Sequence, residues 1–116
     1  MEDLGRDDPV AVVAEYFERM RRGDVSVVDL FSDDAELVGL GGVTRGKSDI
    51  GAFYGDSIRR AAPVPELCGP VLVQGNRVAA EIRIGFSDGN SMHVMDLFVV
   101  DGGLITSLTY FVADEP

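Results

Sequence analysis

The segment Met92–Val100 (Met-His-Val-Met-Asp-Leu-Phe-Val-Val) is apolar almost from end to end and has one carboxyl group, Asp96, at its centre. Side chains alternate along a β-strand, so Asp96 would share a face with Val94 and Phe98. A carboxyl group among apolar neighbours resists ionisation, because a charge is unfavourable away from water. We expect Asp96 either to be a neutral acid that donates a hydrogen bond to a ligand, or to be a structural carboxylate paired with an arginine or with loop amides.

Length, charge and cysteine content limit the possible classes of protein. The 116 residues predict a single domain over 1–116, with 1–8 flexible. A formal net charge of −10 argues against binding nucleic acid or an anionic membrane surface, which requires basic residues. No apolar run approaches the roughly 20 residues of a membrane span. The single Cys68 excludes an intramolecular disulfide and fits a cytoplasmic location. One histidine, His93, with scattered carboxylates gives no metal-ligand spacing, so neither a metal nor a cofactor is expected.

Helical periodicity is confined to the first half of the chain. The first predicted helix starts at Pro9 after an Asp8 cap and ends at Gly23. Its inward face carries Tyr16, whose hydroxyl group needs a partner inside the protein. Two further helices are predicted over Asp24–Phe31 and, after a Ser48 cap, over Asp49–Arg60.

Strand patterns dominate the second half of the chain. Strands are predicted over Glu36–Leu40, Val71–Gln74, Arg77–Phe86, Met92–Val100 and Leu104–Val112. Residues 32–34 are expected to form a turn, the proline-rich residues 61–70 an irregular linker, and residues 87–90 and 101–103 hairpin turns. Helices followed by hairpin-connected strands predict an α+β fold, in which three N-terminal helices pack on a curved antiparallel sheet and enclose a pocket.

Five short stretches form a recognisable pattern: Val12–Tyr16, Gly23-Asp24, Leu30–Ala35, Gly46–Tyr54 and Asp96–Phe98. Together they resemble bacterial ketosteroid isomerase and, more broadly, the NTF2-like or SnoaL-like cone fold. The resemblance implies that Tyr16 and a protonated Asp96 form an oxyanion hole for a ketone oxygen, with Tyr54 supporting Tyr16. It also implies a homodimer that pairs through the outer sheet face, where Glu81, Arg83 and His93 should lie.

The general base of that family is missing from this sequence. The matching position is Gly39, and residues 37–48 contain no Asp, Glu or His. Glu36 is the nearest carboxylate, but strand alternation turns it away from the face that Leu37 and Gly39 share. If Gly39 simply leaves an empty space, Gly39→Asp should restore proton transfer.

Three functions remain open. The first is a ketosteroid isomerase-like enzyme that binds a hydrophobic ketone. The second is a SnoaL-like cyclase, dehydratase or epoxide-opening enzyme acting on a polyketide-like substrate, and the third is a non-catalytic small-molecule binding or dimerisation module. In each case a hydrophobic ligand would contact the residues expected to line the pocket: Phe17, Met20, Phe53, Ile58, Ile82, Ile84, Phe86, Phe98, Leu108, Tyr110 and Val112.

Overall fold

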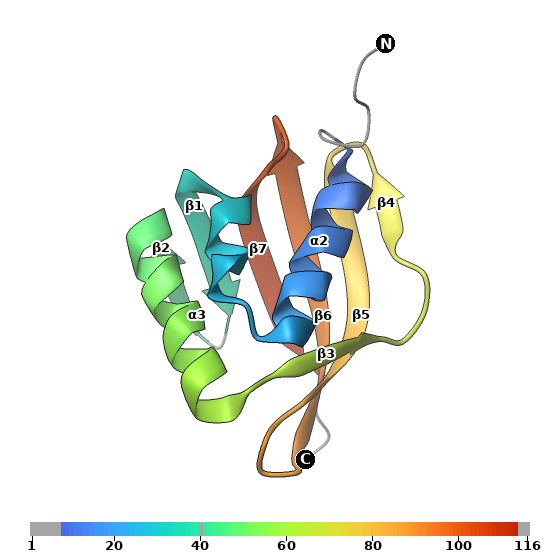
Figure 1. The fold of residues 1–116 in the computed structure, drawn as a ribbon. Coiled ribbons are helices and arrows are strands. Elements are labelled where there is room, and N and C mark those ends of the chain that lie inside the picture. Colours follow the sequence, from blue (N-terminus) through green and yellow to red (C-terminus); the bar gives the residue numbers. More distant parts are fainter. Residues whose placement is uncertain (1–7, 40, 114–116) are drawn as a thin grey trace.

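Among the residues that the structure describes, three helical segments lie against one face of a seven-stranded curved sheet (Figure 1). The computed structural model describes residues 8–39 and 41–113, so the flexibility predicted for residues 1–8 falls, except at Asp8, outside the described residues. In chain order the elements are α2 (Pro9–Arg22), the 3-10 helix η1 (Val25–Leu30), β1 (Phe31–Gly39), β2 (Gly42–Arg45), α3 (Lys47–Ala61), β3 (Val64–Leu67), β4 (Leu72–Gln74), β5 (Arg77–Gly85), β6 (Ser91–Asp101) and β7 (Leu104–Val112). The predicted α+β class is confirmed.

The sheet is mixed, whereas the sequence predicted an antiparallel one. Its strand order is β2-β1-β7-β6-β5-β3, with β4 also paired to β5. The first strand, β1, runs parallel to the last strand, β7, and every other pairing is antiparallel. Parallel neighbours need a long crossover between them, and here the rest of the sheet and α3 supply it. The strand β6 therefore lies between two long partners, in the interior of the sheet.

Helix α2, which corresponds to the first predicted helix, has the predicted ends. The Asp8 side chain accepts a hydrogen bond from the Val10 N–H group at 3.0 Å, and Pro9 occupies the first helical position. Gly23 adopts a left-handed conformation (φ 67°) that suits glycine and ends the helix. The predicted second helix is the 3-10 helix η1, which Asp24 caps by accepting from the Ser26 N–H group at 2.9 Å.

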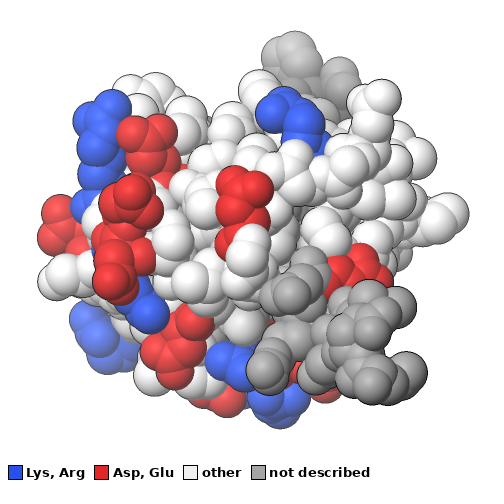
Figure 2. Space-filling view, turned by 90° about the horizontal axis from the view of Figure 1, so that it is seen from above, with Lys and Arg blue, Asp and Glu red and all other residues white. Residues whose placement is uncertain are grey.

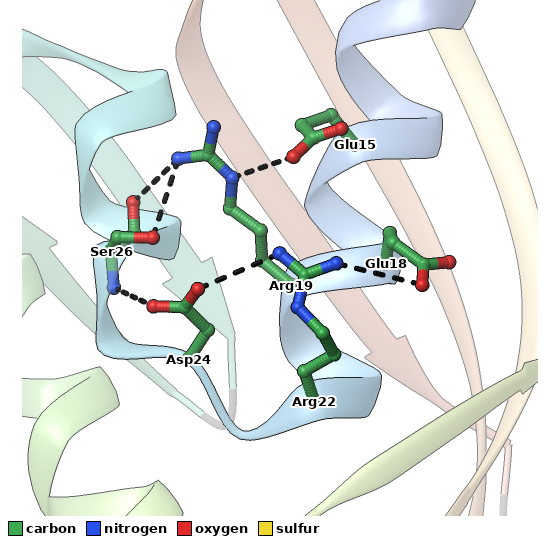
Figure 3. Close-up of polar contacts among 6 residues, drawn as sticks. All are labelled: Glu15, Glu18, Arg19, Arg22, Asp24 and Ser26. Carbon is green, nitrogen blue, oxygen red and sulfur yellow. Dashed lines mark hydrogen bonds and ion pairs between the residues drawn. The ribbon is translucent and has the colours of Figure 1, made fainter.

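Polar contacts fix the turn between α2 and η1 (Figure 3). Arg19 pairs with Glu15 at 2.8 Å, and its guanidinium group also donates to the Ser26 carbonyl oxygen at 3.0 Å. Arg22 lies 3.5 Å from the Asp24 carboxylate. Surface ion pairs contribute little individually. The bond from Arg19 to backbone oxygen nevertheless ties the last turn of α2 to the segment that leads into β1.

Acidic and basic side chains lie close together on the face of the molecule that Figure 2 shows. Figure 2 shows acidic and basic residues side by side toward the left of the view, with uncharged surface over much of the remainder. On this face the negative net charge is therefore not gathered into one acidic patch. None of the helices among the described residues is long and apolar enough to cross a membrane.

The N-terminus of α3 differs from the prediction. The helix begins at Lys47 after a Gly46 cap position, and Ser48 lies inside its first turn as an exposed residue without a capping bond. A glycine cap is possible because the Gly46 backbone has φ 89°, which favours glycine, and the Gly46 carbonyl oxygen accepts the first helical hydrogen bond from Ile50.

Two segments predicted to be irregular are strands. Residues 32–34, predicted as a turn, belong to β1, where the register with β7 shifts between Phe31 and Glu36 and places the polar side chains outside. The predicted strand Glu36–Leu40 is the second half of β1, and its residue 40 lies outside the described residues. Within residues 61–70, Val64–Leu67 forms β3 at the sheet edge, which tolerates Pro65 because one side of an edge strand has no partner.

The core lies between the helices and the inward face of the sheet. Phe17, Phe31 and Phe98 are fully buried there, and the Phe98 ring packs edge-on against Tyr16 with 5.1 Å between ring centroids. The outward face of β5 and β6 carries Glu81, Arg83 and His93, as strand alternation predicted. The homodimer assigned to this outer face stays a prediction.

We expect Phe98→Ala to lower the free energy of unfolding by about 3–5 kcal/mol, because it leaves a cavity beneath Tyr16 and Phe17. Phe111→Ala on the neighbouring strand provides the matched control, since that ring is 54% exposed and its loss should change stability by about 0.5 kcal/mol or less. Urea unfolding of the two variants measures both values. Equal losses would contradict this description of the core.

Candidate functional site

A cavity of about 190 Å³ lies between the helices and the concave face of the sheet. Apolar and aromatic side chains form most of its wall, with the hydroxyl groups of three tyrosines, the Ser57 hydroxyl and the Asp96 carboxyl group as its polar side-chain groups. Ligand sites commonly enclose about 300–1,000 Å³. This cavity therefore suits a smaller ligand.

The three predicted catalytic side chains Tyr16, Tyr54 and Asp96 line this one cavity. Most of the residues predicted to contact a ligand line it too: Phe17, Met20, Phe53, Ile82, Ile84, Phe86, Leu108 and Tyr110. Helix α2, helix α3 and the inward faces of β5, β6 and β7 bring them together.

Three predicted ligand contacts lie elsewhere. Phe98 is fully buried beneath Tyr16, so it supports the cavity wall from behind. Ile58 directs a methyl group toward Gly23, at the end of α2. Val112 lies near the end of β7, where it packs partly buried against the core. Sequence periodicity placed each of these side chains on the inward face of its helix or strand. It does not show where along that face the cavity lies.

Five further residues line the cavity: Ser57, Pro63, Pro65, Met92 and Val94. The two β6 residues share the alternation of Asp96, so the sequence contained the signal for them. Ser57 lies one helical turn after Tyr54, which is a comparable signal. Pro63 and Pro65 had no such signal, because residues 61–70 were expected to form an irregular linker. In the structure this segment contains the edge strand β3 and borders the cavity.

The Tyr16 and Tyr54 hydroxyl oxygens are 2.7 Å apart in a buried hydrogen bond. Burial raises the pKa of both phenols, so both stay neutral near physiological pH. One hydroxyl group must donate to the other, because neutral phenols share one proton per hydrogen bond. When Tyr54 donates, the Tyr16 proton is left available for a group in the cavity.

Asp96 is a buried carboxyl group that receives no hydrogen bond or ion pair from the rest of the described chain. Its exposed fraction is 5%, and burial raises its pKa from 3.8 to about 7. Ionisable side chains buried in proteins are normally paired. The alternative expected from sequence, a carboxylate paired with an arginine or with loop amides, is therefore wrong for the described residues. Near neutral pH the group exists in both protonation states, so it can donate or accept a proton.

The space over Gly39 is occupied, which corrects the expectation of an empty position. A β-carbon built on Gly39 would lie 2.5–2.6 Å from ring atoms of Tyr110, closer than any real contact. The register that pairs Val38 with Thr109 brings the glycine beside this tyrosine. Tyr110 also lies directly opposite Asp96 across β6 and β7, and burial together with the Asp96 charge raises its pKa.

We expect Gly39→Ala to destabilise the fold by about 1–3 kcal/mol, because its methyl group overlaps the Tyr110 ring. The same substitution in a Tyr110→Ala background should be much less harmful, and a double-mutant cycle from urea unfolding measures this coupling. Gly55→Ala, in open space within α3, should stabilise by up to about 1 kcal/mol. Additive effects at Gly39 and Tyr110 would show that the two positions do not touch.

The raised pKa of Asp96 makes stability depend on pH. The folded protein retains a proton that the unfolded chain releases between pH 3.8 and about 7, so this group lowers stability as pH rises through that window. The change corresponds to about 4 kcal/mol when the group is fully ionised. We therefore expect Asp96→Asn to gain stability relative to the parent protein as pH rises from 5 to 8, measured by thermal and urea unfolding.

The control for this pH series is Asp29→Asn, which makes the same chemical change at an exposed position on η1. It should leave the pH dependence of the parent protein unchanged. A stability difference between Asp96→Asn and the parent that does not vary with pH would contradict the neutral state of Asp96.

Comparison with known protein families and solved structures supports the fold described above. The sequence model of the SnoaL-like domain matches residues 13–108. Similar solved structures include an NTF2-like protein of unknown function from Cytophaga hutchinsonii, with 15% identity, 97% of this chain and 94% of that chain covered, and a TM-score of 0.81.

Two other similar structures carry names that mention an activity. A putative polyketide cyclase from Sinorhizobium meliloti is 20% identical over 86% of this chain and 93% of its own, with a TM-score of 0.78. A putative SnoaL-like polyketide cyclase from Jannaschia sp. CCS1 is 14% identical over 97% and 90%, with a TM-score of 0.79. No curated protein matches the chain. At these identities the structures show a shared fold, and the family match shows that the chain belongs to the SnoaL-like domain family, with an NTF2-like fold.

Proposed function

We propose that the cavity binds a small hydrophobic carbonyl compound and that Asp96 and Tyr16 activate its oxygen atom. The observation that carries this proposal is the buried Asp96 carboxyl group, which has no partner in the described chain and opens on an apolar cavity. No fully buried side-chain oxygen among the described residues lacks a partner, so the Asp96 carboxyl oxygens reach the cavity, where a ligand can complete their hydrogen bonding.

Both side chains suit an oxygen atom on which negative charge develops. A neutral Asp96 donates one hydrogen bond, and Tyr16 donates another while it accepts from Tyr54. Donors fixed in place before the reaction are most effective in an apolar site, because little water screens them. Tyr54 has no separate reactive role in this scheme and keeps the Tyr16 hydroxyl group oriented.

We favour cyclisation or dehydration with Asp96 as the acid. The position of a separate base at Gly39 is covered by Tyr110, whereas an acid of pKa about 7 transfers protons well near neutral pH. Asp96 would protonate an oxygen that becomes a hydroxyl group or departs as water, and the proton lost from carbon in either reaction would pass to water. The names of two similar structures, both putative polyketide cyclases, support this class. The small cavity favours ligands of one or two rings over a four-ring steroid.

Isomerase-type proton transfer is the second candidate, supported by the combination of Tyr16, Tyr54 and Asp96 in one cavity. It would need water or the ionised form of Asp96 to remove a proton from carbon, because Gly39 has no side chain. Where Asp96 itself is that base, the two reactions use opposite protonation states of Asp96. A non-catalytic carrier would use the same cavity without turnover.

Binding is tested first, with 2-naphthol as a two-ring mimic of an enol. We expect Asp96→Asn and Tyr16→Phe to weaken its binding by roughly tenfold or more each, since each changes or removes one donor to the ligand oxygen. Ser57→Ala, which alters another polar group of the cavity wall, is the matched control and should have little effect. Fluorescence titration gives the dissociation constants. Unchanged affinity in the first two variants would contradict the proposal.

Turnover and its pH dependence separate the candidates. One substrate is a 1,5-diketone, whose cyclisation and dehydration give a conjugated enone, and the other is 3-cyclohexenone, whose isomerisation also gives one. Ultraviolet absorbance follows both products. If Asp96 is the acid, diketone turnover should fall as pH rises through about 7, whereas a base role predicts that cyclohexenone turnover rises there. Ligand binding without turnover of either substrate would favour the carrier.

A further inference from the structure

We propose that Cys68, Glu81 and His93 form a binding site for a divalent transition metal of the zinc class on the outward face of the sheet. The thiol sulfur, a carboxylate oxygen and a ring nitrogen of these residues all lie within 4.8 Å of one another. They come from the chain just after β3, from β5 and from β6. Sequence spacing gave no indication of this site, because folding brings its members together from separate strands.

The backbone holds these three positions in place. The Cys68 N–H group donates to the Glu81 carbonyl oxygen at 2.9 Å, which extends the β3–β5 pairing one residue beyond Leu67. On the other side of β5, Arg83 pairs with His93, so the histidine lies diagonally across from Glu81 on the same face. Its Nε2 atom is 2.7 Å from a Glu81 carboxylate oxygen. Two ligands are thus already in contact, and the third lies on the adjoining strand.

The donor set selects the class of metal. Thiolate, imidazole and carboxylate together favour Zn²⁺ or Co²⁺, whereas Mg²⁺ and Ca²⁺ prefer oxygen ligands alone. Metal–ligand bonds of about 2.0–2.3 Å draw the donor atoms closer than 4.8 Å, and the exposed Cys68 and Glu81 side chains can rotate to do so. Three protein ligands leave a fourth tetrahedral position for water.

Charge on this face also fits a bound dication. Ionised Cys68 and Glu81 would carry two negative charges. Among the described residues, the exposed Arg83 lies beside His93 on this face, and its strand partner Glu66 carries the opposite charge. Adjacent strand residues face opposite ways, so Cys68, Glu81 and His93 lie on the opposite face of the sheet from Asp96 and the cavity. The metal site is therefore independent of the proposed reaction.

The test is a Co²⁺ titration of the full chain kept reduced with a phosphine. We expect one ion per chain, with a thiolate-to-metal charge-transfer band in the near ultraviolet that excess Zn²⁺ abolishes. Cys68→Ser should remove the band. Glu81→Gln and His93→Ala should each weaken binding by roughly tenfold or more, because each removes one of three protein ligands.

The matched control is Glu66→Gln, which removes an exposed carboxylate from the same face without removing a member of the cluster. It should preserve both the band and the affinity. The proposal is overturned by the absence of a charge-transfer band, by a band that survives Cys68→Ser, or by equal weakening in Glu66→Gln and Glu81→Gln. Circular dichroism of each variant establishes that it is folded before titration.

Discussion

The burial of the Asp96 carboxyl group without a partner among the described residues is the constraint on which the rest of the site depends. The group lies on β6, an interior strand between β5 and β7, where an apolar wall and two helices exclude most water. Its raised pKa follows from this desolvation and not from a neighbouring charge. The surrounding packing must therefore be strong enough to tolerate the group, and the buried phenylalanines of α2, β1 and β6 supply that packing.

Gly39 and Tyr110 form the second determinant of the site, because the position of the Tyr110 ring requires a glycine at residue 39. The tyrosine ring fills the space that any side chain at position 39 would enter, so this pair both narrows the cavity and removes the place for a carboxylate base. Tyr110 is also the direct neighbour of Asp96 on the adjacent strand β7, and the Asp96 charge together with burial raises the pKa of the Tyr110 phenol. A substitution at Gly39 can therefore change the cavity volume, proton transfer and the environment of the Asp96 carboxyl group at the same time.

Local sequence signals predicted much of the fold, and contacts between distant residues account for most of the errors. The Asp8 and Gly23 caps, the hairpin turns and the alternation that turns Asp96 inward all depend on neighbours in sequence. The parallel pairing of β1 with β7, the edge strand containing Pro65, and the ring of Tyr110 over Gly39 depend on residues far apart in the chain. Such contacts have no period or cap to reveal them. For the same reason the sequence assigned Phe98 to the ligand surface, although depth within a packed layer decides its position.

Proton binding and ligand binding should be coupled at this site. A ligand oxygen that accepts a hydrogen bond from Asp96 favours the neutral acid, so by linkage it raises the pKa of Asp96 further and itself binds more tightly at lower pH. Ionisation of the free protein would remove about 4 kcal/mol from a stability that is typically only 5–15 kcal/mol. A bound ligand would offset part of this loss by keeping the proton in place. The occupied protein should therefore resist unfolding better than the free protein as pH rises through about 7.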